Sequence, residues 1–258
     1  MEPKSNGTVT RKLLIDIGNT NLKWCWLEGG VLSELKLKPH QQGASPDLPQ
    51  RCWGDEKRPD AVFVANVATP ILNKQIAGWI QENWALTPNF LVSEAEAFGV
   101  RNAYHKPEQL GVDRWLTLIA VRHRYSVPAC IVDSGTAITI DVIQEDGQHL
   151  GGLILPGFEL MRGALLKNTH IPRVQPIKST FDLLGRDTES AVASACLNSA
   201  AALVERVLHS VAGKLGMHPV VLITGSDAAL LSSALTIPTQ LQWDLVMSGL
   251  SVVAMGKS

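Results

Sequence analysis

The sequence predicts an α/β protein built from two similar lobes, each with a mixed sheet flanked by helices. Patterns typical of strands come in groups of three and are followed by patterns typical of helices. An apolar run that ends in Asp, one spacer residue and Gly, with Thr nearby, occurs at 13–20 and again at 130–137, about half the chain length further on. We therefore expect one lobe over residues 1–115 and a second over 116–258.

In the first half, residues 13–20 end in turn residues, and residues 21–27 alternate between polar and apolar. These patterns predict two strands joined by a tight turn, and the alternation of residues 31–38 predicts a third strand. Proline and glycine interrupt residues 39–60, which we expect to be mostly loop. The next predicted elements are a buried strand at 61–66 and a helix that begins at Pro70.

The second half repeats the order strand, turn, strand, turn, strand after a helix. A long helix, another strand and a closing helix follow, which again predicts a mixed sheet with flanking helices. The predicted elements are a helix at 113–125, a strand and turn over 130–137, strands at 138–143 and 149–155, a helix at 187–215, a strand at 219–224 and a helix at 245–255.

The composition is that of a globular chain with little net charge. Of its 258 residues 45% are hydrophobic and 18% are charged, and 23 Lys plus Arg against 24 Asp plus Glu give a formal charge of −1. This balance lacks the basic excess that neutralises a nucleic-acid backbone, so we expect no DNA or RNA partner. The longest stretch without charged residues, 228–243, is interrupted by Pro238 and polar residues, so we expect no transmembrane helix and no membrane partner. The polar opening of the chain lacks the apolar segment of a signal peptide, which predicts a cytoplasmic protein.

The four cysteines are far apart and form no C-x-x-C pair. Their spacing does not fit zinc-knuckle or thioredoxin patterns. Isolated cysteines in apolar runs are typically buried small hydrophobes, and we expect that here rather than disulfides. The residues concerned are Cys25, Cys52, Cys130 and Cys196.

The repeated turn carries residue types suited to a nucleotide phosphate. Asp16 and Asp133 each stand near the tip of a strand, two residues before a glycine. Backbone N–H groups and Thr hydroxyls at such a turn can cradle phosphate oxygens, while the carboxylate holds a hydrated Mg²⁺ or another cation. One such turn alone is more typical of a plain hairpin. Two copies at matching places favour a nucleotide held between two lobes, although no Walker sequence is present.

A third group of polar residues surrounds the start of the helix predicted at 113–125. Asp113 can be read as an N-cap, with Arg114 on a solvated first turn. A cap does not explain the adjacent Gly111 and Arg114. A carboxylate at a helix N-terminus is kept ionised, and in phosphoryl transfer it can accept the proton of the attacking hydroxyl. Arg114 can offer a planar donor fork to a carboxylate of the substrate.

These motifs resemble the three signature sequences of type III pantothenate kinases. The matching segments are Asp16-Ile-Gly-Asn-Thr, Gly111-Val-Asp-Arg and Asp133-Ser-Gly-Thr-Ala, in the family's order and near its separations. Residues 151–157 and 185–188 also fit the family pattern. The family belongs to the acetate and sugar kinase, hsc70 and actin superfamily. The resemblance therefore implies a duplicated actin-like, or ribonuclease H-like, fold with a nucleotide cleft between the lobes.

The resemblance implies ATP-dependent phosphorylation of pantothenate to 4′-phosphopantothenate, the first step of coenzyme A biosynthesis. Asp113 would accept the proton of the pantothenate hydroxyl, and Asp133 would hold the K⁺ or NH₄⁺ ion that the family requires. The family uses ATP with Mg²⁺ and works as a homodimer, with the pantothenate pocket near the subunit interface. ATP would be bound by Asp16, Ile17, Gly18, Asn19, Thr20, Asn21, Leu22, Lys23 and Thr136. Pantothenate would be bound by Tyr104, Gly111, Val112, Asp113, Arg114 and Thr188.

Some of these residues also have ordinary structural interpretations. Tyr104 on a loop, Thr188 in a first helical turn and Lys23 on the polar side of a strand are common without any ligand. The tryptophans, including Trp24, Trp26 and Trp115, occupy strand and helix positions where core packing is expected.

The chain departs from the family pattern at one place, Thr224-Gly225-Ser226-Asp227-Ala228, where the family commonly has a second glycine at Ser226. A side chain disfavours positive φ, so we expect weaker or less selective binding of the nucleotide base there.

Two other functions fit the residues less well. One is that of another small-molecule kinase or phosphohydrolase of the superfamily, against which residues 104–114 argue. The other is a non-catalytic accessory role in transcription, and the near-zero charge argues against direct DNA contact.

Overall fold

The computed structural model describes residues 10–40, 45–171, 183–243 and 245–256. They fall into two compact units that alternate along the chain. Helix α3 (Val112–Arg124) begins in unit 1 and ends in unit 2, and the short helix η1 (Pro107–Gln109) precedes it. Unit 1 comprises residues 1–94, 108–116 and 246–258, and unit 2 comprises 95–107 and 117–245.

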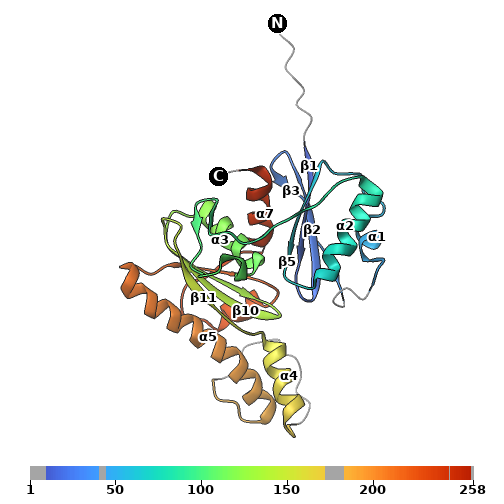
Figure 1. The fold of residues 1–258 in the computed structure, drawn as a ribbon. Helices are drawn as coiled ribbons and strands as arrows, with labels where there is room; N and C mark the ends of the chain where they lie inside the picture. The colour runs from blue at the N-terminus through green and yellow to red at the C-terminus, as the bar shows by residue number, and fades with distance from the viewer. Residues whose placement is uncertain (1–9, 41–44, 172–182, 244, 257–258) are drawn as a thin grey trace. The chain divides into compact units, whose positions relative to one another are not determined.

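Unit 1 contains a mixed sheet whose strand order is β3-β2-β1-β5-β6, with β4 also paired to β2 (Figure 1). The central strand β1 is antiparallel to β2 and parallel to β5. The strands are β1 (Arg11–Ile17), β2 (Asn21–Glu28), β3 (Val31–Leu32), β4 (Lys36–Pro39), β5 (Ala61–Asn66) and β6 (Asn89–Phe90). The helices are α1 (Leu48–Trp53), α2 (Pro70–Trp84) and α7 (Leu245–Met255).

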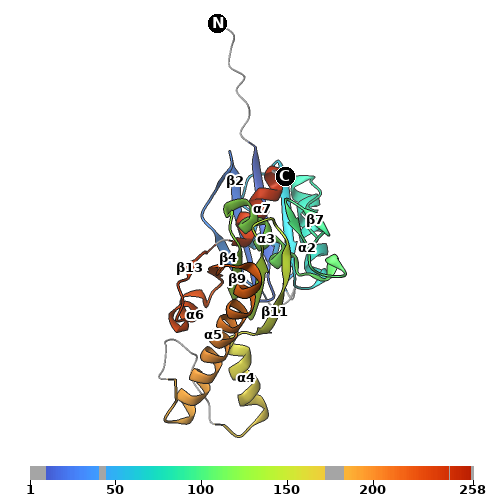
Figure 2. The same ribbon diagram turned by 90° about the vertical axis from the view of Figure 1, so that its left-hand side faces the viewer.

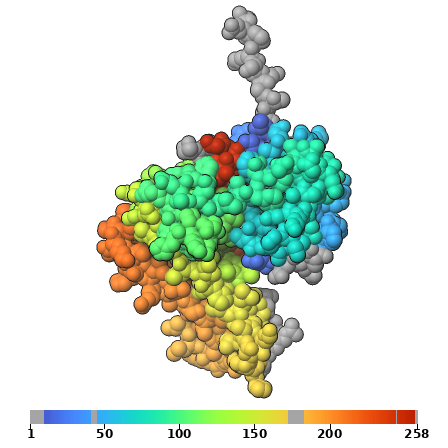
Figure 3. Space-filling view, viewed as in Figure 1, coloured from blue at the N-terminus to red at the C-terminus, as the bar shows by residue number. Residues whose placement is uncertain are grey.

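The two faces of β1 pack against different helices because side chains alternate along a strand. Leu13, Ile15 and Ile17 join the core that α1 and α2 close. The outer surface of α2 forms part of the teal area of Figure 3. On the other face, the Lys12 ammonium donates to the carbonyl of Ala254 in α7 at 2.6 Å. The core interpretation of the tryptophans is confirmed for the named examples, since Trp24, Trp26 and Trp115 are all buried.

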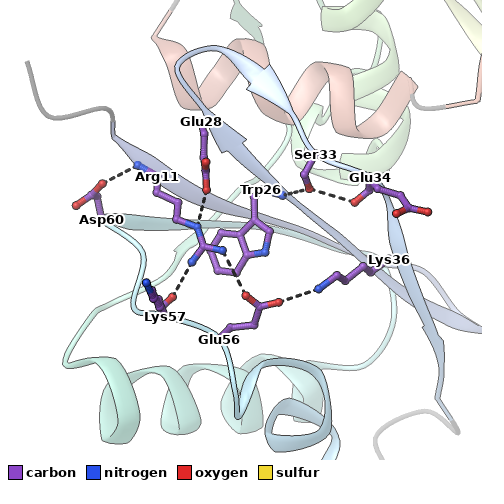
Figure 4. A network of polar contacts seen from close by, with 9 residues as sticks. All are labelled: Arg11, Trp26, Glu28, Ser33, Glu34, Lys36, Glu56, Lys57 and Asp60. Carbon is purple, nitrogen blue, oxygen red and sulfur yellow. Dashed lines mark hydrogen bonds and ion pairs between the residues drawn. The ribbon is translucent and has the colours of Figure 1, made fainter.

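Arg11 fastens the start of β1 to its surroundings (Figure 4). Its guanidinium lies 3.4 Å from the centre of the Trp26 ring and donates to Glu28 Oε1 at 2.6 Å. It also donates to Glu56 Oε2 at 3.3 Å and to the carbonyl of Lys57 at 3.0 Å. The arginine therefore joins two neighbouring strands to the segment that precedes β5.

The third strand expected at 31–38 is interrupted, so it forms the separate strands β3 and β4. Ser33 causes the break: its N–H donates to the carbonyl of Trp26 at 2.8 Å, and its Oγ accepts the N–H of Trp26 at 3.0 Å (Figure 4). A side-chain oxygen thus takes the place of the next ladder acceptor, and regular pairing stops.

The segment 39–60, expected to be mostly loop, also contains helix α1, which was not predicted. Pro49 lies in the first turn of that helix, where proline is tolerated, and Leu48, Cys52 and Trp53 are buried. A helix of six residues is too short to give a recognisable helical period. Residues 41–44 of this loop, and residues 1–9 of the polar opening, lie outside the described residues.

Unit 2 contains a five-stranded mixed sheet of order β11-β10-β9-β12-β13. Its central strand β9 is antiparallel to β10 and parallel to β12, as β1 is to β2 and β5. This matching order confirms the internal repeat. The elements are β7 (Glu96–Ala97), β8 (Val100–Arg101), β9 (Ala129–Ser134), β10 (Ala137–Ile143), β11 (His149–Pro156), α4 (Phe158–Asn168), α5 (Thr188–Leu215), β12 (Val220–Thr224), α6 (Ala228–Ala234) and β13 (Gln240–Leu241).

Helices α4, α5 and α6 pack on one face of this sheet, against Ile138, Ile140 and Val142 of β10. Figure 2 shows α4 and α5 side by side. By length and composition α5 could cross a membrane, but half of its most apolar stretch is buried inside the protein. Since residues such as Ala200 and Val204 belong to the core of unit 2, α5 is packed as a core helix.

The cysteine prediction is confirmed, because all four are free and buried. Burial raises the pKa of Cys130 to about 12 and that of Cys52 to about 11. Thiols with such pKa values stay protonated and unreactive at neutral pH.

Candidate active site

The first turn, residues 16–21, closes the β1–β2 hairpin of unit 1. The N–H of Gly18 donates to the carbonyl of Asn21 at 3.0 Å. Asp16 is only 6% exposed and is the direct cross-strand partner of Lys23. Directly opposed residues have Cβ atoms about 4.5–5.5 Å apart on the same face. The turn therefore presents a carboxylate and an ammonium side by side at the end of the sheet.

His40 supports the first turn from the end of β4. Its Nε2 lies 2.8 Å from the carbonyl oxygen of Gly18, and its backbone N–H donates to the carbonyl of Thr20 at 2.9 Å. In a trans peptide the C=O and the following N–H point in opposite directions. Holding the Gly18 carbonyl therefore turns the N–H of Asn19 away from His40.

The fold itself does not demand a glycine at position 18. Its φ lies outside the left-handed region, and a Cβ there would meet nothing closer than the Asn21 oxygen at 3.5 Å. Gly135, its counterpart in the second half, would likewise meet only Ser226 Oγ at 3.7 Å. Both turns thus leave space that a close ligand such as a phosphate could use.

Asp113 lies in the first turn of α3 rather than at its N-cap, because the helix begins at Val112. Its Oδ1 accepts the N–H of Arg114 at 2.7 Å. Gly111 makes room for this carboxylate, since a Cβ at that position would lie 2.6 Å from Oδ1. The positive end of the helix and this hydrogen bond both favour an ionised Asp113.

Arg114 is 5% exposed, which excludes the alternative interpretation that places it on a solvated first turn. Trp115 beside it is also buried, and its N–H donates to the carbonyl of Gly111 at 3.0 Å. The start of α3 therefore lies in the core of the protein, with Arg114 and Trp115 both buried.

The second turn, residues 133–137, occupies in unit 2 the place of the first turn in unit 1. The N–H of Gly135 donates to the carbonyl of Ala137, and the N–H of Gly157 donates to the carbonyl of Thr136, both at 3.0 Å. Gly157 packs so closely that a Cβ there would lie 2.0 Å from the Gly135 oxygen. The β11–α4 junction therefore fixes the position of Thr136.

Asp133 is held from the other side by the β12–α6 junction. A Cβ at Gly225 would lie 2.5 Å from Asp133 Oδ1 and 2.3 Å from the carbonyl oxygen of Ser134. The N–H of Asp227 donates to that same carbonyl at 2.9 Å. Oxygen ligands of this kind suit a hard cation. Among the described residues there is no group of three or more His, Cys, Asp or Glu that could hold a metal ion.

Ser226 does not adopt a positive φ, and weaker binding of the nucleotide base at this turn stays a prediction. Within the described part of the chain, the non-glycine residues with positive φ are Ala85 and Phe98. The left-handed conformation at this turn belongs to Gly225, with φ of +98°. Asp227, which follows, has its pKa raised by burial and by the nearby charge of Glu159.

Tyr104 and Thr188, the remaining predicted pantothenate residues, lie in unit 2. The N–H of Tyr104 donates to Asn102 Oδ1 at 3.0 Å, and its ring lies nearly parallel to that of His149. Thr188 is the first residue of α5 and follows the N-cap Asp187. The N–H of Ser190 donates to Asp187 and holds the pKa of that carboxyl below its usual range.

The structure thus places Asp16 and Asp113 in unit 1, and Asp133 in unit 2. Their convergence on one site stays a prediction. The support from His40 and the close packing of Gly157 and Gly225 were not predicted from the sequence. The buried pair of Asp141 and His149 was not predicted either, although a charged residue inside an apolar strand is a usable signal.

Comparison with known proteins gives a consistent result. A family model described as type III pantothenate kinase matches residues 12–210. A type III pantothenate kinase from Nitrosococcus oceani is 38% identical, covering 94% of this chain and 93% of its own length. One from Alcanivorax borkumensis is 35% identical, covering 94% and 98%.

Solved structures of lower identity share the fold. A protein described as a Baf family transcriptional activator from Campylobacter jejuni has a TM-score of 0.63 at 19% identity, covering 95% of this chain and 100% of that one. MreB 5 of Spiroplasma citri bound to AMPPNP has a TM-score of 0.52 at 11% identity, covering 98% and 97%. These likenesses show the duplicated actin-like α/β fold. Since the family model spans most of the sequence and the curated relatives match over nearly its whole length, the chain belongs to the type III pantothenate kinase family.

Proposed function

We propose that this protein transfers the γ-phosphoryl group of ATP to the primary hydroxyl of pantothenate, giving 4′-phosphopantothenate, the first step of coenzyme A biosynthesis. The observation that carries the proposal is the Gly111–Arg114 segment. There Asp113 lies in the first turn of α3, and its Oδ1 accepts the N–H of Arg114 at 2.7 Å, within a segment that the family model covers. An ionised carboxylate is the form that a general base requires.

In the proposed reaction, the first turn binds ATP phosphates through its N–H groups, with Thr20 and Lys23 adding donors. Asp16 would hold the hydrated Mg²⁺, which supplies charge neutralisation at the transferring phosphoryl group when bound. The pantothenate hydroxyl attacks phosphorus in line, the bond to the leaving ADP oxygen breaks, and Asp113 accepts the hydroxyl proton. Thr136 completes the phosphate contacts from the second turn.

We assign the residues that bind pantothenate from the match between their chemistry and that of the substrate. Pantothenate carries a carboxylate, and the buried guanidinium of Arg114 offers two parallel donors to such a group. We assign Tyr104 and Thr188 to the same pocket. Asp133 would hold K⁺ or NH₄⁺, because its carboxylate and the Ser134 carbonyl supply oxygen ligands beside Gly225.

We also propose a cytoplasmic homodimer. β11 is an edge strand of the unit 2 sheet, yet Leu150, Leu153 and Ile154 on it are exposed. Soluble proteins normally protect an apolar edge strand from association. A second copy of the chain covering this edge would remove the exposure.

The direct test is a coupled assay of the purified protein with ATP, Mg²⁺ and pantothenate, with and without K⁺. Wild-type protein should phosphorylate pantothenate in preference to other hydroxylated acceptors and should need the monovalent cation. Asp113→Asn should lower kcat by about 10²–10⁴-fold, the range for loss of a general base, without changing the unfolding midpoint much. Glu108→Gln, at an exposed acid of the same segment, is the matched control and should keep wild-type turnover. Preference for another acceptor would overturn the proposed substrate, and wild-type turnover by Asp113→Asn would overturn its role.

A further inference from the structure

Asp141 and His149 form a fully buried polar pair that the proposed mechanism does not use. His149 is 0% exposed and Asp141 is 1% exposed. The Nε2 atom of His149 lies 2.9 Å from Asp141 Oδ1. Both face away from α4 and α5, because Ile140 and Val142 on either side of Asp141 belong to the apolar core. A buried polar pair of this kind is costly to keep unless every partner is satisfied.

The hydrogen bonds assign the tautomer of His149. The backbone N–H of Ala103 donates to Nδ1 at 3.4 Å, so that nitrogen must offer a lone pair. The ring proton is therefore on Nε2, from which it is donated to Asp141 Oδ1. Asp141 thereby fixes both the tautomer and the orientation of the imidazole.

The ring so fixed supports the segment that carries Tyr104. His149 holds Ala103 directly, and the Tyr104 ring lies above it at a centroid distance of 6.3 Å and an interplanar angle of 15°. Offset parallel stacking at such a distance is an attractive arrangement for two rings. The imidazole thus contacts the backbone just before Tyr104 and the side chain of Tyr104 itself.

The same segment is attached to the β10–β11 turn at a second place. The N–H of Arg101 donates to the carbonyl of Gly147 at 2.9 Å, and its Nε donates to Gln148 Oε1 at 3.1 Å. Gly99 packs on Gly147 so closely that a Cβ at Gly147 would lie 1.8 Å from the Gly99 oxygen. These contacts fix residues 99–101, whereas His149 acts two residues further on, next to Tyr104.

We infer that His149, oriented by Asp141, is a positioning residue that holds Tyr104 in place for the acceptor substrate. This inference rests on the proposed function, because Tyr104 contacts pantothenate only if that function is right. Loss of the His149 contacts should therefore raise KM for pantothenate and leave KM for ATP unchanged.

Two substitutions separate the two hydrogen bonds of His149. His149→Asn keeps an acceptor near the Nδ1 position but loses the bond to Asp141, whereas His149→Gln keeps a donor near the Nε2 position but loses the bond to Ala103. We expect both variants to raise KM for pantothenate about tenfold, with KM for ATP within twofold of wild type. The matched control is Val142→Ala on the opposite face of β10, which should lower the unfolding midpoint while leaving both KM values unchanged.

A double-substitution cycle tests whether His149 acts through Tyr104. If it does, adding His149→Asn to Tyr104→Leu should change KM for pantothenate no further. Nitrogen NMR of the full-length protein should show the ring proton of His149 on Nε2, and Asp141→Asn should weaken that preference. Equal rises in both KM values, a response like that of Val142→Ala, or full additivity in the cycle would each overturn the inference. Failure of the wild-type protein to phosphorylate pantothenate would instead overturn the proposed function, and the NMR result would then still decide the assigned tautomer.

Discussion

The first and second turns occupy equivalent places in two sheets of the same strand order, but they are held in different ways. The first turn is held by hydrogen bonds from one residue, His40, to Gly18 and Thr20. The second turn is enclosed by two close-packed glycines, Gly157 and Gly225. Duplication of the topology has therefore not duplicated the contacts that support the turns.

This difference separates two reasons for having a glycine. At Gly157 and Gly225 a Cβ would overlap the backbone of the second turn, so the fold requires glycine. At Gly18 and Gly135 the fold leaves room for a Cβ, so the reason must lie elsewhere, and we attribute it to the approaching phosphates. Substitutions at Gly157 and Gly225 should lower stability, whereas substitutions at Gly18 and Gly135 should weaken nucleotide binding with little change in stability.

The largest effect is expected from Gly157→Ala. The new Cβ would lie 2.0 Å from the Gly135 oxygen and 2.7 Å from the Thr136 oxygen, so the second turn must move. We expect stability to fall by about 1–3 kcal/mol, as for overpacking. Displacement of Thr136 should lower kcat/KM by about 10²-fold. Urea unfolding and steady-state kinetics measure the two effects.

Gly163→Ala is the control for this substitution. Gly163 lies in α4, only a few residues away, and a Cβ there would meet nothing within 4 Å. The change should stabilise the protein by about 0.5–1 kcal/mol through helix propensity and leave kcat/KM unaltered. If Gly157→Ala behaved in the same way, the close packing of the second turn would not be needed for stability or for activity.

The next largest effect is expected from Gly18→Ala. A Cβ fits the folded protein but occupies space beside the phosphate donors, so we expect KM for ATP to rise about tenfold, as for loss of one charged hydrogen bond. The unfolding midpoint should hardly change. Titration with ATP measures the change in nucleotide binding, and thermal unfolding measures the midpoint. Unchanged ATP binding would contradict the assignment of this turn to phosphate.

A smaller effect is expected at His40. His40→Ala removes one hydrogen bond to the Gly18 carbonyl, which should raise KM for ATP by about threefold. His40→Gln can place an amide donor near the same carbonyl and should recover most of the wild-type value. If the alanine and glutamine variants had equal KM values, the bond to Gly18 would not be what supports the first turn.

The smallest effect is a pH dependence of stability, and it concerns Asp227, whose N–H donates to the second turn. The pKa of Asp227 is raised, mainly by burial and also by Glu159, so ionisation of this carboxyl destabilises the folded state. Wild-type stability relative to Asp227→Asn should therefore be highest below the ordinary Asp pKa of about 4 and fall as pH rises through the raised pKa. Unfolding midpoints of both proteins between pH 4 and pH 7 would reveal this, and parallel curves would contradict it.

The alternation of apolar residues was enough to predict the repeated sheets and most long helices. Strand β5 was predicted at its observed ends, Ala61 and Asn66. Where one side chain replaces a backbone partner, as Ser33 does opposite Trp26, the alternation continues although the strand does not. The short helix α1 was missed because six residues are stabilised by tertiary burial of Trp53 rather than by a local pattern.

The candidate site was predictable as far as its motifs are contiguous. Asp16, Asp113 and Asp133 could be named because each lies within a short signature. The residues that hold these motifs come from distant parts of the chain. Gly225, for example, meets Asp133 only because β12 pairs with β9. Such contacts depend on tertiary packing, which cannot be predicted from a local motif.

Because of helix α7, the two units are completed at different stages of synthesis. The helix comes from the C-terminal end of the chain, yet it packs in unit 1, where Gly249 approaches Leu116 so closely that a Cβ would lie 2.1 Å from its carbonyl oxygen. Domains generally fold as their sequence emerges from the ribosome. Unit 2 is complete once residue 245 has emerged, whereas the sheet that begins at Arg11 lacks one of its covering helices until α7 has emerged. Unit 1 therefore begins before unit 2 in the chain but is completed after it, and a nascent chain that stops before α7 would leave unit 1 exposed to chaperones and proteases.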